Sequence, residues 1–398
     1  MDARPEVKPR FPADRPAKRA ALLAAVESIR ETVLAHADEA EAHGTLARPV
    51  VDALVGSGLL RLKLPAALGG AEADPALQFD VIEALSAIDP STGWCLMIGG
   101  SGIGLPGAFL SDEAVAEMFE GGRVPTGAII PLPVGEARPV QGGYRVTGRW
   151  PFVSGVPHAE WVTVGARVIR DGEPPKPRLF VVRAESVLLH DNWHVAGLKG
   201  TGSCDVSLAD VFVPEAFTWD RLGTPARRGG VLYRLGHPGF VANEHAAFAI
   251  GVGRGALDAV MALAKSKRRS FAASPSAIEE RAVFQRFVGL ADMRLRSARS
   301  LVLEIYDEAW SFASQGEVPP PRVQAAIRGV TAFATEVAAE VTTEAFRFGG
   351  GEAAFVGSRL QRYLRDINVG AQHLMVSAIA YENHGQFLMG LPGADPLR

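Results

Sequence analysis

Residues 349–373 read GGGEAAFVGSRLQRYLRDINVGAQH, and this stretch is the most informative part of the chain. A cluster of glycines, Gly349–Gly351, is followed by the pair Arg365-Asp366 within a run of helical apolar spacing. The spacing predicts one helix over 321–348, before the glycines, and another over 360–389, after them. We interpret the Arg365-Asp366 pair as a structural ion pair at the floor of an active site.

The preceding sequence continues this helical pattern. Apolar residues recur at helical spacing over 243–267 and 277–315, and a run of prolines at 319–321 separates the second segment from the next helix. Proline is tolerated in the first turn of a helix, so this run can also start the helix that follows. Four long helices in succession predict an antiparallel bundle.

The first 125 residues or so are also predicted to be helical. Helical spacing covers 19–42 and 47–57, and a third helix is expected over 75–88. The segment Asp89–Thr92 is typical of a helix cap before a buried segment, which here contains Trp94.

Between these helical regions the periodicity changes. Short segments rich in β-branched and aromatic residues, bounded by Gly, Pro and Asp, predict strands. They are 144–148, 161–164, 179–182, 206–208 and 211–213. We therefore expect an all-β insert from about Pro125 to Pro214, and three domains: a helical domain 1–124, a β domain 125–225 and a helical bundle 226–398.

Composition excludes several classes of protein. The chain has 398 residues, of which 47% are hydrophobic and 21% charged, as in ordinary globular proteins, and its net charge is -3. There is no basic surface for nucleic acid and no polybasic membrane anchor. The two cysteines, Cys95 and Cys204, are far apart and have no metal-ligand spacing, which indicates a reducing compartment without a disulfide framework.

Targeting signals are not expected either. Residues 1–18 are rich in Pro, Arg and Asp and lack the apolar core of a signal peptide. No apolar run approaches the ~20 residues of a membrane helix. We predict a cytoplasmic protein that binds neither membrane nor nucleic acid.

The order of helices, β insert and helical bundle, together with the stretch 349–373, resembles the acyl-CoA dehydrogenase superfamily over nearly the whole chain. In the dehydrogenases of that superfamily this signature is commonly followed by a catalytic glutamate, which here should fall at about Leu374. The chain has no carboxylate at that position, and its neighbour is His373. This pattern resembles the two-component flavin-dependent monooxygenases (the group D hydroxylases), which are built on the same frame.

The resemblance implies a mainly α fold with a middle β-barrel and a C-terminal four-helix bundle. It also implies reduced FMN or FAD, delivered by a separate NAD(P)H-dependent flavin reductase, and O2, which gives a C4a-hydroperoxyflavin. The product would be a small molecule oxygenated at an aromatic carbon or an amine nitrogen. No metal is expected.

The strongest local motif is Gly148–Trp161. It resembles the flavin-facing strand of the family, in which Phe152 would stack beside the isoalloxazine, Ser154 would bond flavin N5 and Val153 would line the cofactor between them. Strand alternation supports this match, because residues two apart point to the same face. The alternative is a plain Ser-Gly turn between strands.

Glycines supply further candidates for the flavin site. The loop Gly197–Ser203 resembles the family's loop along the flavin, which makes Gly202 and Ser203 candidates; a simple β connection is the alternative. Gly349 and Gly350 permit, without requiring, an adenine end of the cofactor. The run Gly251–Gly255 has no strand before it, so we interpret it as close helix packing and not as a dinucleotide fingerprint.

Arg269 and Gln285 resemble a family pair that reaches the flavin phosphates or adenosine of a neighbouring subunit. The planar guanidinium of arginine matches phosphate oxygens well. The alternative for Arg269 is a solvated basic helix end. If the site crosses subunits, the protein must be an oligomer, and the family implies a homotetramer.

His373 and Ser154 are the predicted catalytic residues. The near-neutral pKa of an unperturbed histidine suits proton exchange with a peroxide or substrate; the alternative for His373 is a buried residue on an apolar helix. Trp94 and Gly102 are candidate substrate-binding residues, because glycines at 99–104 would make room for a ligand. The segment lacks the histidine that phenol-hydroxylating relatives carry there, so N- or S-oxygenation stays open.

Two other functions compete with this prediction. The first is an acyl-CoA dehydrogenase whose base has moved to Glu244, near the start of the helix after the β domain. The second is a helical relative that has lost its cofactor and serves in assembly, which would bind flavin in neither redox state.

Overall fold

The computed structural model describes residues 10–220, 223–266 and 277–397. The chain forms two compact units. The β unit comprises the residues up to Ala73, Trp94–His194 and Lys199–Tyr233; the bundle unit comprises Asp74–Gly93, Val195–Leu198 and the residues from Arg234. The limits of the three predicted domains stay a prediction.

The helices of the β unit confirm the two predicted at 19–42 and 47–57 and add two whose limits the sequence did not predict. They are α1 (Arg15–His43), α2 (Arg48–Ser57), most of α4 (Pro90–Phe109) and α5 (Asp112–Met118). The carboxylate of Asp14 accepts a hydrogen bond from Ala17 N, which satisfies a backbone donor at the start of α1, and Gly44 ends the helix with φ 67°. Helices α1 and α2 pack together.

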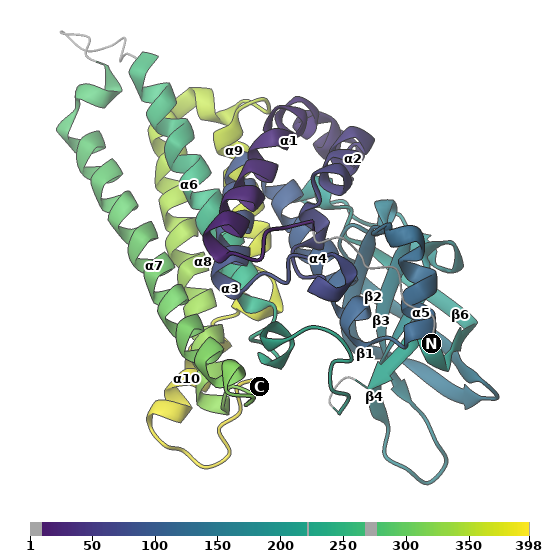
Figure 1. The fold of residues 1–398 in the computed structure, drawn as a ribbon. Helices are drawn as coiled ribbons and strands as arrows, with labels where there is room; N and C mark the ends of the chain where they lie inside the picture. The colour runs from purple at the N-terminus through teal and green to yellow at the C-terminus, as the bar shows by residue number, and fades with distance from the viewer. Residues whose placement is uncertain (1–9, 221–222, 267–276, 398) are drawn as a thin grey trace. The chain divides into compact units, whose positions relative to one another are not determined.

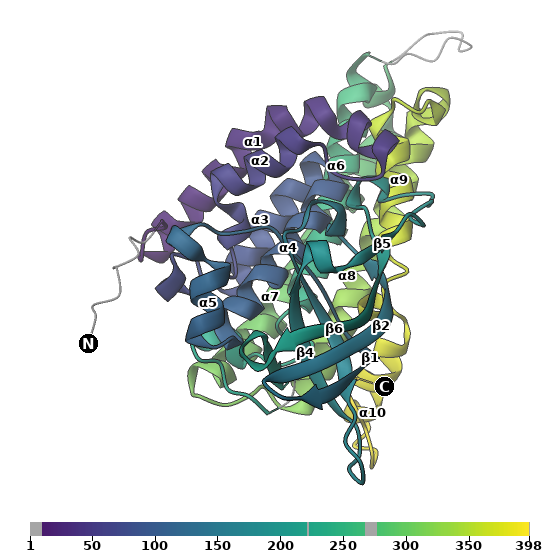
Figure 2. The ribbon, with the colours of Figure 1, turned by 90° about the vertical axis from the view of Figure 1, so that its right-hand side faces the viewer.

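The β unit holds a single sheet of seven strands in the order β5-β6-β2-β1-β3-β4-β7, so β5 and β7 form its two edges. Strands β1, β2, β4, β5 and β6 are labelled in Figure 2. Strands β1 and β3 pair in parallel, and the other neighbours are antiparallel. The strands are β1 (Gly127–Val140), β2 (Gly143–Val153), β3 (Trp161–Val168), β4 (Lys176–Arg183), β5 (Leu188–His190), β6 (Cys204–Pro214) and β7 (Thr218–Asp220).

Every predicted strand segment lies in this sheet, but the sequence did not predict β1, which occupies its centre. Prolines inside a segment argue against a central strand, because proline cannot donate to the ladder. β1 contains Pro131 and Pro133, and its pairing with β3 shifts register on both sides of Pro133. The two segments predicted at 206–208 and 211–213 are both part of β6.

The bundle unit is built on α6 (Ala242–Ser266), α7 (Ala282–Ser314) and α8 (Pro321–Gly349), which lie side by side in Figure 1. Helix α3 (Pro75–Ile88) packs against α6. The glycines of α6 make this packing possible, since a Cβ at Gly251 would lie 2.4 Å from Glu83 O and one at Gly255 would lie 2.7 Å from Ala87 O. The prediction of close helix packing at these glycines is confirmed.

Helix α6 also corrects one expectation from the sequence. Residues Ala242–Lys265 are long and apolar enough to cross a membrane by length and composition, with a mean hydropathy of 1.5. The prediction that no apolar run approaches this length is therefore wrong. In the structure 67% of that window is buried, as in the core helix of a bundle.

The last predicted helix, 360–389, is wrong as a continuous element. The structure has α9 (Arg359–Gly370), then the short 3-10 helix η11 (Leu374–Val376), then α10 (Ile379–Leu388). The apolar spacing continues through the interruption, so periodicity alone did not reveal it. His373 lies in this break and caps η11 instead of standing on the face of a helix.

Candidate active site

Three hydroxyl groups form a buried cluster in the β unit. The Ser154 and Ser203 Oγ atoms are 2.7 Å apart, and the Ser203 Oγ lies 2.7 Å from Thr201 Oγ1. All three residues are buried. The indole N–H of Trp94 donates to Ser154 Oγ at 3.0 Å. The cluster thus joins the end of β2, the start of β6 and helix α4.

The protons of this cluster can be arranged in three ways, because Ser203 can pass its proton to either neighbour or accept from both. Each hydroxyl has one proton to donate, and the chain Thr201–Ser203–Ser154 contains two hydrogen bonds. Because Trp94 occupies an acceptor position of Ser154, the bonds can run from Thr201 through Ser203 to Ser154. In that direction the Ser154 proton is available to a further acceptor, as a contact to a flavin nitrogen requires.

The local geometry of Phe152 differs from the prediction. The register between β2 and β6 shifts between Trp150 and Val153, and Phe152 adopts φ 60°. Such a conformation is strained for an aromatic residue and often marks a functional site. As a result Phe152 is 67% exposed, whereas Ser154 is 6% exposed. Regular strand alternation therefore does not extend through Phe152 to Ser154, and the flavin contact of Phe152 stays a prediction.

The neighbours of Ser154 also have local reasons for their positions. Ser154 follows the last residue of β2, and Gly155 turns the chain with φ 75°. The Ser-Gly turn and the flavin contact are thus compatible and not exclusive alternatives. The Val153 side chain is fully buried in the core, so only its backbone is left for a ligand. Phe152 packs edge-on against Trp193, with ring centroids 6.3 Å apart.

Gly202 brings Ser203 into the cluster. It follows the 3-10 helix η6 (Lys199–Thr201) with φ 54°, and a Cβ there would lie 2.7 Å from the ring of Pro157. Only glycine fits this reversal of the chain. The loop therefore has a steric reason for its glycine in addition to any contact with a cofactor.

His158 is a polar residue of this region that the sequence did not single out. It ends the 3-10 helix η4 (Val156–His158), directly after the Ser154-Gly155 turn. In the described part of the chain its buried Nδ1 has no hydrogen-bond partner. Burial lowers the pKa of His158 to about 4, so the ring is neutral near neutral pH. In the sequence, only its position close to Ser154-Gly155 could have indicated that His158 lies near this site.

The bundle unit contributes a pair of buried histidines. The rings of His245, on the first turns of α6, and His373 are stacked with centroids 4.3 Å apart and an interplanar angle of 26°. Burial lowers the pKa of His373 to about 4. The sequence predicted His373 but gave no role to His245, because 128 positions separate them in the chain.

Arg328 fixes the break that carries His373. This buried arginine of α8 donates from Nη2 to Leu374 O at 3.2 Å and from Nη1 to Pro396 O at 3.0 Å. Leu374, at the position expected for a dehydrogenase base, is half exposed. The backbone next to His373 is thus tied to the bundle through its carbonyl group.

Arg365 and Asp366 both bond the backbone of a neighbouring segment. Asp366 Oδ1 accepts from Leu198 N at 2.6 Å, and Arg365 Nη1 donates to Ala196 O at 2.7 Å. A Cβ at Gly197 would lie 2.2 Å from Arg365 O. The two side chains hold the backbone of the segment 195–198 against α9, and the ion pair at an active-site floor stays a prediction.

The structure does not support Glu244 as a relocated base. Glu244 lies in the first turn of α6 and is fully buried. The neighbouring Asn243 N donates to the hydroxyl of the buried Tyr306 at 2.7 Å, and that hydroxyl donates to Gly239 O at 3.0 Å. The Glu244 carboxyl group is thus enclosed by protein.

The other predicted residues are scattered. Gln285 is exposed near the start of α7 and donates to Glu279 O at 3.1 Å. Gly349 ends α8, where a Cβ would lie 2.6 Å from Leu360 Cδ1, and Gly350 has φ 55° and ψ -146°, a conformation open only to glycine. Arg269 lies outside the described residues.

Gly102 has a packing role. A Cβ at this position of α4 would lie 3.0 Å from the Gly127 carbonyl carbon and 3.1 Å from Ala128 N. The space beside Gly102 is therefore filled by the backbone of β1 and not left for a substrate. The prediction that it binds substrate is not supported, and the role of Trp94 in substrate binding stays a prediction.

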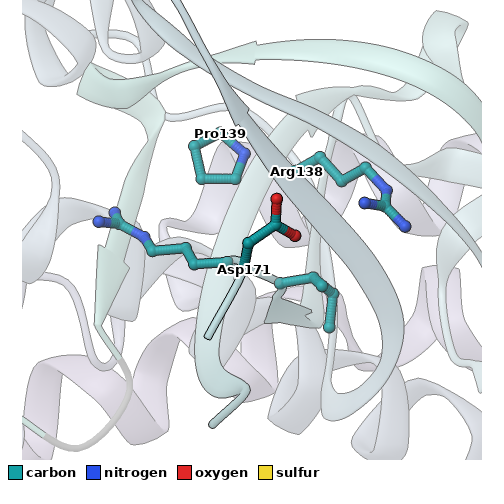
Figure 3. A pocket seen from close by; sticks show the side chains of 5 residues that line it. Arg138, Pro139 and Asp171 are labelled. Carbon is teal, nitrogen blue, oxygen red and sulfur yellow. The ribbon is translucent and has the colours of Figure 1, made fainter. Parts of the chain in front are cut away.

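Two surface hollows lie elsewhere in the β unit. The larger, of about 430 Å³, is lined by Arg138, Pro139, Ile169, Arg170 and Asp171 (Figure 3). The second, of about 140 Å³, shares Arg170. Both are open, and neither contains a residue predicted for the flavin site, so they do not define the active site.

Comparison with protein families agrees with this architecture. Residues 16–117 match the acyl-CoA dehydrogenase N-terminal domain, and residues 244–378 match the acyl-CoA dehydrogenase C-terminal domain. The fold is therefore that of the acyl-CoA dehydrogenases, and the match covers the helical regions on both sides of the sheet.

Comparison with individual proteins narrows the class. The chain is 32% identical to indole-3-acetate monooxygenase of Pseudomonas putida over 96% of this chain and 97% of that protein. It is 29% identical to the oxygenase subunit HsaA of a flavin-dependent monooxygenase of Rhodococcus jostii, over 94% and 99% of the two chains. The structure of XiaF from Streptomyces in complex with FADH2 and glycerol has a TM-score of 0.85, 26% identity and coverages of 96% and 97%.

This chain belongs to the acyl-CoA dehydrogenase superfamily, in its branch of flavin-dependent monooxygenases. It is an oxidoreductase of the two-component type. The carboxylate missing at Leu374 agrees with this class and argues against the dehydrogenase alternative.

Proposed function

We propose that this chain is the oxygenase component that inserts one atom of O2 into a small aromatic or heteroaromatic molecule, at a ring carbon or at a nitrogen. The other oxygen atom leaves as water, and reduced flavin from a separate NAD(P)H-dependent reductase supplies the two electrons. The observation that carries the proposal is the hydroxyl cluster around Ser154, combined with the loss of the dehydrogenase glutamate at Leu374. The names of the relatives support an aromatic substrate.

The residues of the β unit fit a flavin. Ser154 carries a proton that the chain from Thr201 through Ser203 can direct outward, and Phe152 exposes an aromatic ring two residues earlier. We assign Ser154 to donate a hydrogen bond to the flavin at N5, and Ser203 to orient it. Gly202 and the backbone of Val153 line the same contact.

The buried surroundings of these groups suit oxygen chemistry. Water in an oxygenase site promotes loss of peroxide, so a dry pocket protects the reaction. Trp94 contributes an apolar wall and takes up an acceptor position of Ser154 that water would otherwise occupy. In the bundle unit, we assign His373 to donate a hydrogen bond to the reacting oxygen or substrate.

The cofactor is FAD or FMN, and we favour FAD because FADH2 is bound in the Streptomyces relative. Gln285 and Arg269 are assigned to the phosphate or adenosine side, and the glycines Gly349 and Gly350 leave backbone accessible for an adenine end. The exposure of Gln285 suits a contact with a neighbouring subunit of a homotetramer. We place the protein in the cytoplasm.

Oxygen labelling tests the proposal. The purified chain would be mixed with anaerobically reduced FAD, then with buffer containing ¹⁸O2 and one probe from a set of indole-3-acetate, a phenol and an aryl amine. A product with one labelled oxygen, absent without the chain, is the expected result. Reduction of bound oxidised flavin by an acyl-CoA, with no labelled product, would establish a dehydrogenase instead. No flavin binding in either redox state would favour the non-enzymatic alternative.

A further inference from the structure

The pairing of His245 with His373 is the starting point. His245 is 5% exposed, and its ring lies nearly parallel to that of His373 at 4.3 Å. Stacking of two planar rings restricts rotation about the side-chain bonds of both. Because His245 stands on the continuous helix α6 while His373 lies in a break between helices, the helix supplies the rigid member of the pair.

A backbone amide selects the tautomer of His373. The N–H of Met375 donates to His373 Nδ1 at 3.2 Å. A backbone N–H can only donate, so Nδ1 must carry a lone pair. The neutral ring therefore has its proton on Nε2. Loading a second proton onto Nδ1 would break the bond to Met375.

We propose that His245 is a positioning residue that, with the Met375 N–H, holds His373 in one ring plane and in the neutral tautomer with its proton on Nε2. His373 is then a hydrogen-bond donor and not a general base. This inference rests on the proposed function, in which His373 acts in the oxygenation. It also explains how the chain manages without a carboxylate at Leu374, since the group beside that position presents a proton instead of removing one.

The charges around the pair are compatible with a neutral ring. On α6 the neighbour of His245 is the buried Glu244, and on α8 the guanidinium of Arg328 bonds the carbonyl group of Leu374. From the C-terminal segments, His384 on α10 approaches α8 at Gly329, and Asp395 acts on Arg328. Burial lowers the pKa of His373 to about 4, in agreement with a ring that stays neutral.

Nitrogen NMR of the protein labelled with ¹⁵N-histidine tests this tautomer directly, without cofactor or substrate. The His373→Gln variant assigns the His373 signals, and His190, whose ring bonds Ser207 Oγ at 2.7 Å, serves as an internal reference. We expect His373 to show a protonated Nε2 and an unprotonated Nδ1 from about pH 5 to pH 8. A proton on Nδ1, or titration near the ordinary value of about 6.5, would overturn the inference.

Two variants test whether His245 positions the ring of His373. His245→Phe keeps a stacked ring and is expected to leave the His373 tautomer unchanged. His245→Ala removes the stack and is expected to give a mixture of tautomers, with the titration midpoint raised by about one pH unit, a tenfold gain in proton affinity. If His245→Ala folds and keeps the single tautomer, His245 is not the positioning residue. If it does not fold, a changed tautomer in His245→Phe refutes the same role.

The proposed function can fail separately. If the NMR result is as expected but no labelled product forms in ¹⁸O2, the tautomer assignment stands and the monooxygenase assignment falls. If labelled product forms while His373 titrates as an ordinary histidine, the function stands and the role of His245 is refuted. His36→Ala, a variant of a partly buried histidine on α1 whose ring contacts Glu39, controls for general effects of removing a histidine.

Discussion

The hydroxyl cluster of the β unit and the histidine pair of the bundle unit handle protons differently. In the first, each of the bonds among Thr201, Ser203 and Ser154 can run in either direction. In the second, the Met375 N–H allows His373 a single neutral tautomer. Hydroxyl groups rotate to suit a partner, whereas a stacked imidazole bound to a backbone amide does not.

The hydroxyl cluster can therefore change its hydrogen-bond directions, whereas the histidine pair keeps one pattern of donors and acceptors. Serine and threonine hydroxyls can serve a cofactor that arrives and leaves with each reduction, because the donor direction reverses without movement of heavy atoms. A histidine with one tautomer presents the same Nε2–H donor in every catalytic cycle. The structure therefore suggests that the β unit responds to the flavin while the bundle unit presents a constant group.

Removal of His373 should have the largest effect. His373→Ala is expected to lower oxygenation by about 10³-fold, the upper end of the range for loss of one placed hydrogen-bond donor in a water-excluded site. His373→Gln, which keeps an amide N–H donor, should retain more activity than the alanine variant if His373 donates. Both are measured as labelled product in ¹⁸O2. Equal losses in the two variants would show that donation is not its role.

Removal of the Ser154 hydroxyl comes next. Ser154→Ala is expected to reduce oxygenation by about 10²–10³-fold, the range for loss of one placed donor in a dry site. Affinity for reduced flavin, followed by fluorescence titration, should fall as well. Ser207→Ala is the matched control, because Ser207 lies in β6 of the same unit and bonds His190 instead of the cluster. Similar effects in both variants would contradict the assignment.

Acid should destabilise both regions through one buried histidine each. The pKa of His158 and that of His373 are lowered from 6.5 to about 4 by burial. The unfolded chain binds these protons first, so stability is complete above about pH 6.5 and is lost as the pH falls toward 4, by up to about 3 kcal/mol for each group.

Denaturant unfolding between these pH values measures this loss. His158→Gln should remove the part that belongs to the β unit, and His373→Gln the part that belongs to the bundle unit. If either variant keeps the full pH dependence of the wild type, the corresponding histidine is not buried and neutral.

Removal of the carboxylate that bonds the backbone of residues 195–198 should have a smaller effect on stability. Asp366→Ala leaves the buried Leu198 N–H without its carboxylate acceptor, which is expected to cost about 1–3 kcal/mol of unfolding free energy. Asp366→Asn retains an acceptor oxygen and should cost less. Calorimetry of both variants measures the difference. An unchanged stability in Asp366→Ala would show that water replaces the carboxylate there.

Trp94→Phe is the mildest test of the hydroxyl cluster. It removes one N–H donor while keeping an aromatic ring, so the loss in unfolding free energy should be about 1 kcal/mol. Without this N–H, the Ser154 hydroxyl should be held less firmly in the orientation that donates to the flavin. The effect is measured as a lower yield of labelled product per reduced flavin consumed. A yield equal to that of the wild type would leave Trp94 with only a packing role.

Much of the site could be predicted because its motifs are local. Ser154 and Ser203 each lie next to a glycine that turns the chain, and such short patterns are readable from residue order. Helix positions were predicted within a few residues wherever apolar spacing was strong, as for α3 and α8. The break at His373 escaped prediction because the apolar spacing runs through it.

The sequence determined the order of helices and strands, and its motifs carried the resemblance that implied the family, the class of reaction and the candidates Ser154 and His373, because residue order and short motifs are properties of the chain. The folded arrangement was needed to show that Phe152 leaves the strand face and that Asp366 holds the backbone at Leu198. It was also needed to bring His245 onto His373. Such pairings depend on packing between residues far apart in the chain, and no local pattern encodes which distant side chain fills the space beside another.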